Sequence, residues 1–208
     1  MHSAIRRTSI VALSAAALVA ACSKGENNAD STRMADSAAA APATPAAAPA
    51  APATPTLTDA NIVAIVDHAN MADSATGNVA ATKGTNSEVK AFGRDMMRDH
   101  HALRKMGQDL AKKANITPQP PANDSSDARD KAWLDSLNSM PKGAAWDKAY
   151  IDHEVGVHQE VLSTLHTAEN AAQNADLKAL ITKAIPTIES HLKKAQDIQS
   201  KLQSAKSS

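Results

Sequence analysis

Apolar residues recur every three or four positions through most of the chain after residue 57, which is the period of α-helices that bury one face. Glycine, proline and capping residues divide this pattern into four long stretches and one short stretch. The expected helices cover about residues 58–83, 87–115, 125–140, 144–174 and 175–203. Two tight turns and one longer connection between these stretches predict an all-α, antiparallel four-helix bundle with a short extra helix in the long connection.

Local signals set the boundaries of these helices. Thr58 or Asp59 can cap the first helix, because short polar side chains accept hydrogen bonds from the free N–H groups of a first turn. Residues 83–86 combine a glycine stop with a new capping residue, and residues 141–143 separate the short helix from the next long one. Aromatic residues make up only 2% of the chain, so we expect a core of small and aliphatic side chains, which suits closely packed helices.

The first 21 residues have the pattern of an export signal. Arg6 and Arg7 precede an uncharged run over residues 10–21, which has about the length of a signal core and is too short for an ordinary membrane span. Residues 19–22 resemble the lipobox of bacterial lipoproteins, in which a cysteine after small residues is lipidated and becomes the new N-terminus. Cys22 is the only cysteine of the chain. A free or buried thiol is the alternative interpretation.

The lipobox resemblance implies acyl chains on Cys22 that hold the protein on a membrane of the bacterial cell envelope. Ser23 follows the cysteine. By the usual sorting rule of such lipoproteins, the absence of Asp at this place indicates an outer-membrane lipoprotein that faces the periplasm. Residues 41–55 are Ala, Pro and Thr with no large apolar side chain to bury, which predicts a disordered, polyproline-like tether. We therefore expect a signal peptide over residues 1–21, a tether over 22–56 and the bundle over 57–205.

The charge balance excludes one class of partner. The chain has 22 basic and 22 acidic residues, so bulk positive charge cannot hold nucleic acid.

A glycine-rich phosphate loop, a Gly-x-Ser-x-Gly motif and a Cys–His nucleophile pair are all missing from the sequence. The sequence names no reaction, and a role without catalysis is favoured.

Five polar residues lie on or beside the apolar faces of the long helices. We call them the polar layer: Asp73, His100, Glu154, His158 and His191. The three histidines and the aspartate are each about 12 to 16 residues from the nearest hairpin turn. Because a helix rises about 1.5 Å per residue, these side chains are expected to meet at one level near the middle of the bundle.

A buried polar group without a partner costs about 1–3 kcal/mol, so the polar layer needs an internal partner. One solution is a transition metal ion, because neutral imidazoles and carboxylates are ligands for Zn, Fe, Mn or Cu, and the nearby thioether of Met96 favours copper. The predicted ligands are then His100, His158, His191, Asp73 and Glu154. The other solution is a hydrogen-bonded layer with trapped water that only fixes the helix register in a structural or protein-interaction module.

The remaining polar positions carry weaker signals. Four further histidines fall at or beyond the edges of the apolar faces, where we expect them to be solvated: His68, His101, His153 and His166. Asp99 lies on an ordinary charged face of the second long helix but could turn inward.

Three segments resemble one bacterial family. Residues 89–100, VKAFGRDMMRDH, are similar to the VKxFAxxMxxDH signature of the family filed as domain of unknown function 4142. Residues 146–158 are similar to its FDxxYxxxxVxxH segment, and residues 185–195 to its LPxLxxHLxxA ending. The resemblance covers about residues 59–202. It implies a ferritin-like bundle, export to the envelope and inward positions for the three histidines of these motifs.

The chain departs from the family pattern on its first helix, where Asp73 stands in place of the Glu of many members. The Glu-x-x-His pairs that hold the metals of di-iron ferritins are also missing. The residues three before the motif histidines are Met97, Val155 and Ile188. The resemblance therefore does not extend to a di-iron oxidase or an iron-storage cage.

Overall fold

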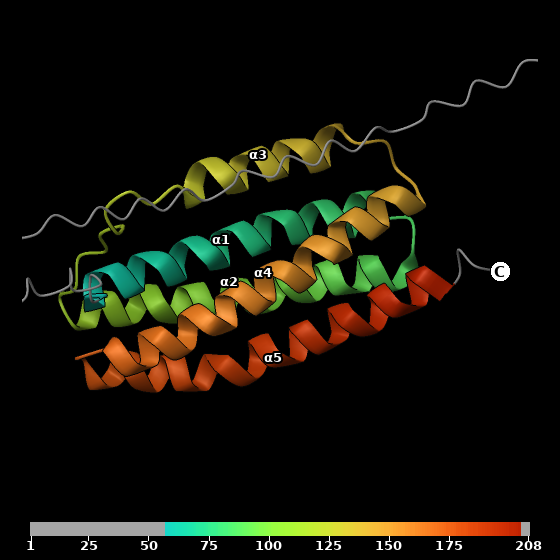
Figure 1. Ribbon diagram of the computed structural model, residues 1–208. Coiled ribbons are helices and arrows are strands. Elements are labelled where there is room, and N and C mark those ends of the chain that lie inside the picture. Colours follow the sequence, from blue (N-terminus) through green and yellow to red (C-terminus); the bar gives the residue numbers. More distant parts are fainter. Residues whose placement is uncertain (1–56, 205–208) are drawn as a thin grey trace, which may run out of the picture. The chain divides into compact units, whose positions relative to one another are not determined.

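The computed structural model describes residues 57–204, and all regular structure in this range is helical. The helices follow one another along the chain as α1 (Asp59–Lys83), α2 (Ser87–Lys113), α3 (Ser126–Ser139), α4 (Ala144–Ala171) and α5 (Ala175–Ser204) (Figure 1). The expected all-α bundle with a short extra helix is confirmed. Within the described range, no helix has the length and apolar character needed to cross a membrane. The predicted signal peptide, the tether and Cys22 lie outside the described residues.

The four long helices form two hairpins. α1 packs along α2, α4 packs along α5, and the two hairpins meet mainly through α2 and α5. α1 and α4 touch each other much less, and α3 lies over α1 on the outside of the bundle (Figure 1). The sparse contact between α1 and α4 leaves room for the cavity described below.

The ends of the helices agree with the sequence expectations to within a few residues. Thr58 caps α1 in a capping box, in which the Asn61 N–H donates to the Thr58 hydroxyl at 3.2 Å and the Thr58 N–H donates to the Asn61 side chain at 3.1 Å. α4 ends at Ala171 rather than at Asn174. Asn174 instead accepts a hydrogen bond from the Leu177 N–H at 2.9 Å and so caps the start of α5.

Buried and half-buried polar side chains join the hairpins at one end of the bundle. Asp147, in the first turn of α4, accepts hydrogen bonds from the Thr85 hydroxyl and from the N–H groups of Thr85 and Asn86, the last two at 2.8 Å. This carboxylate ties the turn between α1 and α2 to the start of α4. Lys83 donates to the carbonyl oxygen of Leu137 at 2.7 Å, near the end of α3, where a cation also complements the helix dipole.

Two facing glycines allow a close approach of α1 and α2. A Cβ atom on Gly77 would lie 2.8 Å from the carbonyl oxygen of Gly93, and one on Gly93 would lie 2.6 Å from the carbonyl oxygen of Gly77. Real side chains do not make contacts this short, so only glycine allows the two backbones to pack at this distance. Gly93 lies about two turns before His100, and the crossing therefore helps to set the depth of that imidazole.

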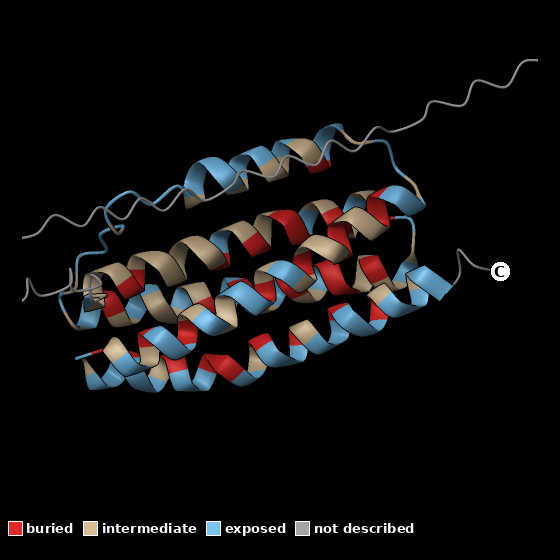
Figure 2. Ribbon diagram, viewed as in Figure 1, coloured by how far each residue is buried: buried red, intermediate tan, exposed pale blue. Residues whose placement is uncertain are grey.

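The buried residues form two apolar clusters with the polar layer between them. One cluster contains Ile62, Leu103 and Leu165, and the other contains Phe92 and Tyr150. On each of the four long helices the members of the polar layer stand between positions that belong to the two clusters, and the buried residues face the interior of the bundle (Figure 2). The four helices are thus in the register that the sequence spacing predicted.

Candidate metal centre

Three imidazoles meet in the middle of the bundle, one each from α2, α4 and α5. His100, His158 and His191 are only 1%, 1% and 5% exposed. Their ring centroids are 5.7, 5.2 and 5.7 Å apart, and one ring nitrogen of each lies within 4.8 Å of the others. The expectation that these three rings share one depth is confirmed. We call these residues the histidine triad.

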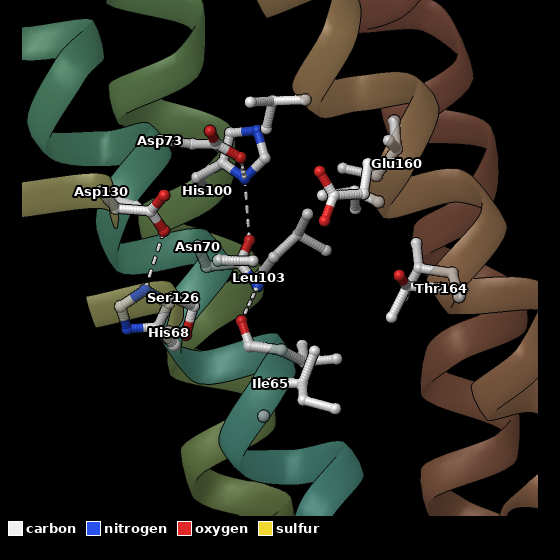
Figure 3. Close-up of a pocket in the computed structure, with 18 of the residues that line it drawn as sticks. Ile65, His68, Asn70, Asp73, His100, Leu103, Ser126, Asp130, Glu160 and Thr164 are labelled. Carbon is white, nitrogen blue, oxygen red and sulfur yellow. Dashed lines mark hydrogen bonds and ion pairs between the residues drawn. The ribbon is translucent and has the colours of Figure 1, made fainter. Parts of the chain in front are cut away.

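Asn70 fixes the orientation and the tautomer of His100. Nδ1 of His100 lies 2.9 Å from Oδ1 of Asn70, and the amide nitrogen of Asn70 donates to the carbonyl oxygen of Val66 at 2.7 Å (Figure 3). Because the amide nitrogen is already used as a donor, the atom that faces the imidazole is an acceptor. The hydrogen-bond network therefore assigns the proton of His100 to Nδ1 and leaves a lone pair on Nε2.

The other two imidazoles are held in the same way by oxygen acceptors. Nδ1 of His158 donates to the backbone carbonyl oxygen of Glu154 at 2.9 Å. Nε2 of His191 lies 3.0 Å from Oδ2 of Asp99, and hydrogen bonds from Arg98 hold the pKa of that carboxyl below its usual value. An ionised carboxylate only accepts, so His191 donates through Nε2. The lone pairs of these two rings lie on Nε2 of His158 and on Nδ1 of His191.

The three nitrogens that carry lone pairs have no hydrogen-bond partner among the described residues, although all three are buried. Neutral imidazole nitrogens are ligands for zinc, copper, iron and nickel. In metal sites the second ring nitrogen of a histidine ligand usually donates to an oxygen, which fixes the ring and raises its basicity. Each member of the triad has such an oxygen behind it, so the residues present fit a transition metal ion.

The surroundings keep the triad uncharged at neutral pH. Burial lowers the pKa of His100 well below its usual value, and the neighbouring imidazoles lower it further. Burial, with a smaller contribution from His191, lowers the pKa of His158 to about 4. Burial also lowers the pKa of His191, although Asp99 opposes this. Neutral imidazoles need not release a proton before they bind a cation.

The two carboxylates of the polar layer lie beside the imidazoles rather than between them. Oδ2 of Asp73 is 3.5 Å from Nδ1 of His100, and Oε2 of Glu154 is 3.5 Å from Nδ1 of His158. Burial raises the pKa of Asp73 to about 7 and that of Glu154 well above its usual value. Thr76 donates a long hydrogen bond to Glu154 at 3.4 Å. Both carboxylates thus adjoin the nitrogens that already donate to oxygen, and their role as direct metal ligands stays a prediction.

The prediction that four further histidines are solvated holds for His101 and His166, which are exposed, and is wrong for the other two. His68 is half-buried and pairs with carboxylates of α3, and His153 is half-buried and stacks on Trp133 of α3 at a centroid distance of 4.1 Å. The apolar period of the long helices does not show where α3 lies, so it could not reveal this cover.

Sequence reasoning missed Asn70, which is only 5% exposed. A signal was available, because Asn70 lies four residues after Val66 and three before Asp73 and therefore shares their buried face. Asparagine is also disfavoured inside helices, where its side chain competes for backbone hydrogen bonds. An amide in such a place indicates a specific partner.

The inward turn of Asp99, which the sequence left open, is seen in the structure.

The family described as "Domain of unknown function (DUF4142)" matches residues 42–198. The chain belongs to this family. The resemblance carried by the three sequence segments is therefore confirmed, and the triad of this DUF4142 protein consists of the histidine of each segment.

Among solved structures, this DUF4142 protein is similar to "CopM in the Cu(II)-bound form". The two share 14% sequence identity with a TM-score of 0.54, over 70% of this chain and 98% of that chain. At this identity the likeness shows a shared fold, which is a helical bundle. None of the curated proteins matches the chain.

Proposed function

We propose that this protein is an exported, lipid-anchored protein of the bacterial cell envelope whose bundle binds one transition metal ion through His100, His158 and His191. The observation that carries the proposal is the set of three buried, unpartnered ring nitrogens on three helices. One ring nitrogen of each histidine lies within 4.8 Å of the others, which is close enough for small side-chain rotations to bring all three rings to one ion with bonds of about 2.0–2.1 Å.

The donor set favours metals of intermediate softness. Neutral nitrogen ligands suit Cu and Zn, and also Fe, better than the oxygen-seeking Mg and Ca. Copper is the first metal to test, because a protein of the same fold is named in a Cu(II)-bound form. Asp73 and Glu154 lie beside the outer nitrogens of His100 and His158. We expect these carboxylates to offset part of the charge of a bound ion.

The envelope location rests on the first 22 residues of the sequence. A cationic start, a short apolar run and a single cysteine after small residues are what a lipoprotein signal requires. A tethered bundle with one buried metal site and no motif for a reaction suits the handling of metal, or tolerance of metal stress, outside the cytoplasm.

The test is to titrate Cu(II) and Zn(II) into the metal-free full chain and to compare single variants at the triad. His100→Ala, His158→Ala and His191→Ala should each weaken binding by more than about 100-fold, because the loss of a ligand should exceed the 10–100-fold effect of losing an outer partner. His101→Ala is the matched control, since His101 follows His100 but is exposed. It should bind about one equivalent, as the unchanged chain does.

Circular dichroism separates a lost ligand from a lost fold. If folded variants at the triad keep the metal content of the unchanged chain, the proposal is wrong. If the unchanged chain binds neither metal and His158→Ala loses stability whether or not a chelator is present, the polar layer only fixes the register of the helices.

A further inference from the structure

A cavity of about 300 Å³ lies between the two hairpins, on the side where they face each other through α1 and α4. These two helices contact each other less than α2 and α5 do. This volume is at the lower end of the range for small-molecule pockets and is about twice that of an engineered 150 Å³ cavity that holds benzene. Apolar side chains from α1, α2, α4 and α5 form most of its wall, including Ile65, Val66, Leu103, Val161, Leu165 and Ile181. A largely apolar molecule would fit such a wall.

The inner end of the cavity is formed by a carboxyl group. Asp73 lines the cavity but is only 5% exposed. Among the described residues its side chain has one contact with a donor, Nδ1 of His100, and that contact is long at 3.5 Å. His100 donates its proton to Asn70 instead, at 2.9 Å. Asp73 is therefore a buried acceptor without a proper donor, and it adjoins the cavity (Figure 3).

The charged side chains elsewhere in the cavity wall are also mostly acidic. Asp124, Asp130 and Glu160 line the outer part, where α3 and the loop before it cover α1 and α4. The cation among them, Arg129, is paired with Asp130 at 3.0 Å and with Glu160 at 3.5 Å. Carboxylates thus outnumber cations from the mouth to the inner end. This charge pattern repels organic acids and favours a molecule that carries a positive charge.

We propose that this cavity binds a small, largely apolar organic amine, with its ammonium group donating to Asp73 and its apolar body lying between α1, α4 and α5. A charge-assisted hydrogen bond to an ionised carboxylate is among the stronger polar contacts. Desolvation by the apolar wall strengthens it further. The site is distinct from the histidine triad, because of the three imidazoles only His100 lines the cavity.

The experiment uses two probes with the same apolar body, 1-adamantylamine and 1-adamantanecarboxylate. Each is titrated calorimetrically into the full chain at neutral pH, with a chelator present so that no metal contributes. The amine should bind at least tenfold more tightly than the carboxylate. Its binding should also change the fluorescence of the protein, and Trp133→Phe should abolish this change, since Trp133 lines the cavity.

Two variants and one control locate the contact. Asp73→Asn removes the charge at the inner end and should bring the affinities of the two probes to within about threefold. Ala69→Phe fills the cavity and should abolish binding of both probes. Asp109→Asn removes an exposed carboxylate that does not line the cavity and should change neither affinity. Circular dichroism confirms that each variant is folded.

Three results would overturn the proposal. The first is that the carboxylate binds as tightly as the amine. The second is that the preference for the amine survives in folded Asp73→Asn. The third is that neither probe binds the unchanged chain at millimolar concentration. None of these depends on whether the triad binds a metal, because the chelator is present throughout.

Discussion

A single amide decides which atom of His100 points into the triad. Asn70 uses its side-chain nitrogen on the carbonyl oxygen of Val66, so its oxygen is turned toward His100. If the amide were reversed, it would offer a donor and favour the other tautomer of the imidazole. The tautomers of His158 and His191 are set by a backbone carbonyl and by a carboxylate. The proposed metal site thus depends on oxygen atoms that are not themselves among the proposed ligands.

We expect Asn70→Ala to weaken metal binding by about 10–100-fold, because such outer partners orient the ligand and raise its basicity. Competition titration with a coloured chelator measures the change. Asn78→Ala is the control, since Asn78 lies on the same helix with an exposed side chain. Equal affinities for the two variants would show that Asn70 does not control His100.

The buried carboxyl group of Asp73 should make the stability of the chain depend on pH, and this effect can be measured in metal-free protein. Burial raises its pKa to about 7 in the folded chain, against a usual value of 3.8. Between these two values the folded state holds a proton that the unfolded state has lost. The stability that this group contributes is complete below about pH 3.8 and is lost as the pH rises through about 7.

Asp73→Asn keeps the size of the side chain but cannot ionise. We therefore expect this variant to become more stable relative to the unchanged chain as the pH rises from about 5 to about 8, so that the difference between the two free energies of unfolding rises in favour of the variant. Urea unfolding with a chelator at each pH measures the difference. A difference that is constant over this range would show that Asp73 does not titrate there.

At the scale of elements, the crossing of α1 and α2 depends on a pair of glycines. A methyl group on Gly93 would lie 2.7 Å from the backbone nitrogen of Ala81 and 2.6 Å from the carbonyl oxygen of Gly77. These are backbone atoms, which cannot turn aside as a long side chain can. The helices would have to separate, and His100 would move with α2.

Gly93→Ala should therefore destabilise the chain by about 1–3 kcal/mol, as overpacking of a tight interior does, and should also weaken metal binding. Gly107→Ala on the same helix is the control, because a Cβ atom there meets nothing within 4 Å. That variant should gain about 0.5–1 kcal/mol from helix propensity. Thermal unfolding and metal titration of both variants check this. A Gly93→Ala chain as stable as the control would show that the contact is not tight.

At the scale of the whole molecule, the bundle has two apolar clusters with the polar layer between them. Shifting one helix along its axis by a turn would place imidazoles or carboxyls among aliphatic side chains, which is costly for buried polar groups. The polar layer therefore fixes the register of the bundle even without a metal. The cavity lies on the one side where the two hairpins are loosely packed.

The proposed anchor gives a prediction for the molecule in its cell. Cys22→Ser removes the proposed attachment point of the acyl chains, so the variant should leave the membrane fraction for the soluble fraction of the envelope. Cell fractionation with immunoblotting measures this. Metal binding by the soluble variant should be unchanged, since Cys22 precedes the bundle. A variant that stays with the membrane would show that another feature holds the chain there.

Much of the fold could be read from the chain because helix periodicity and capping are local properties. The spacing of apolar residues gave the four long helices, and Thr58 gave the start of the first. Counting residues from the hairpin turns placed the three histidines at one level. Counting could not place Asn70 behind His100 or α3 over His68 and His153, because these contacts depend on how each helix is rotated and on where a loop carries the chain.

By itself, the sequence determined the helices, their antiparallel order and the depth of the polar layer, since each follows from the fixed rise and period of an α-helix. The tertiary structure decided the rest. It set which nitrogen of each imidazole is free, turned the carboxylates of Asp73 and Glu154 toward the outer nitrogens, and opened a cavity between α1 and α4. The physical reason is that hydrogen-bond direction and void space depend on helix rotation and separation, which packing of the whole bundle fixes.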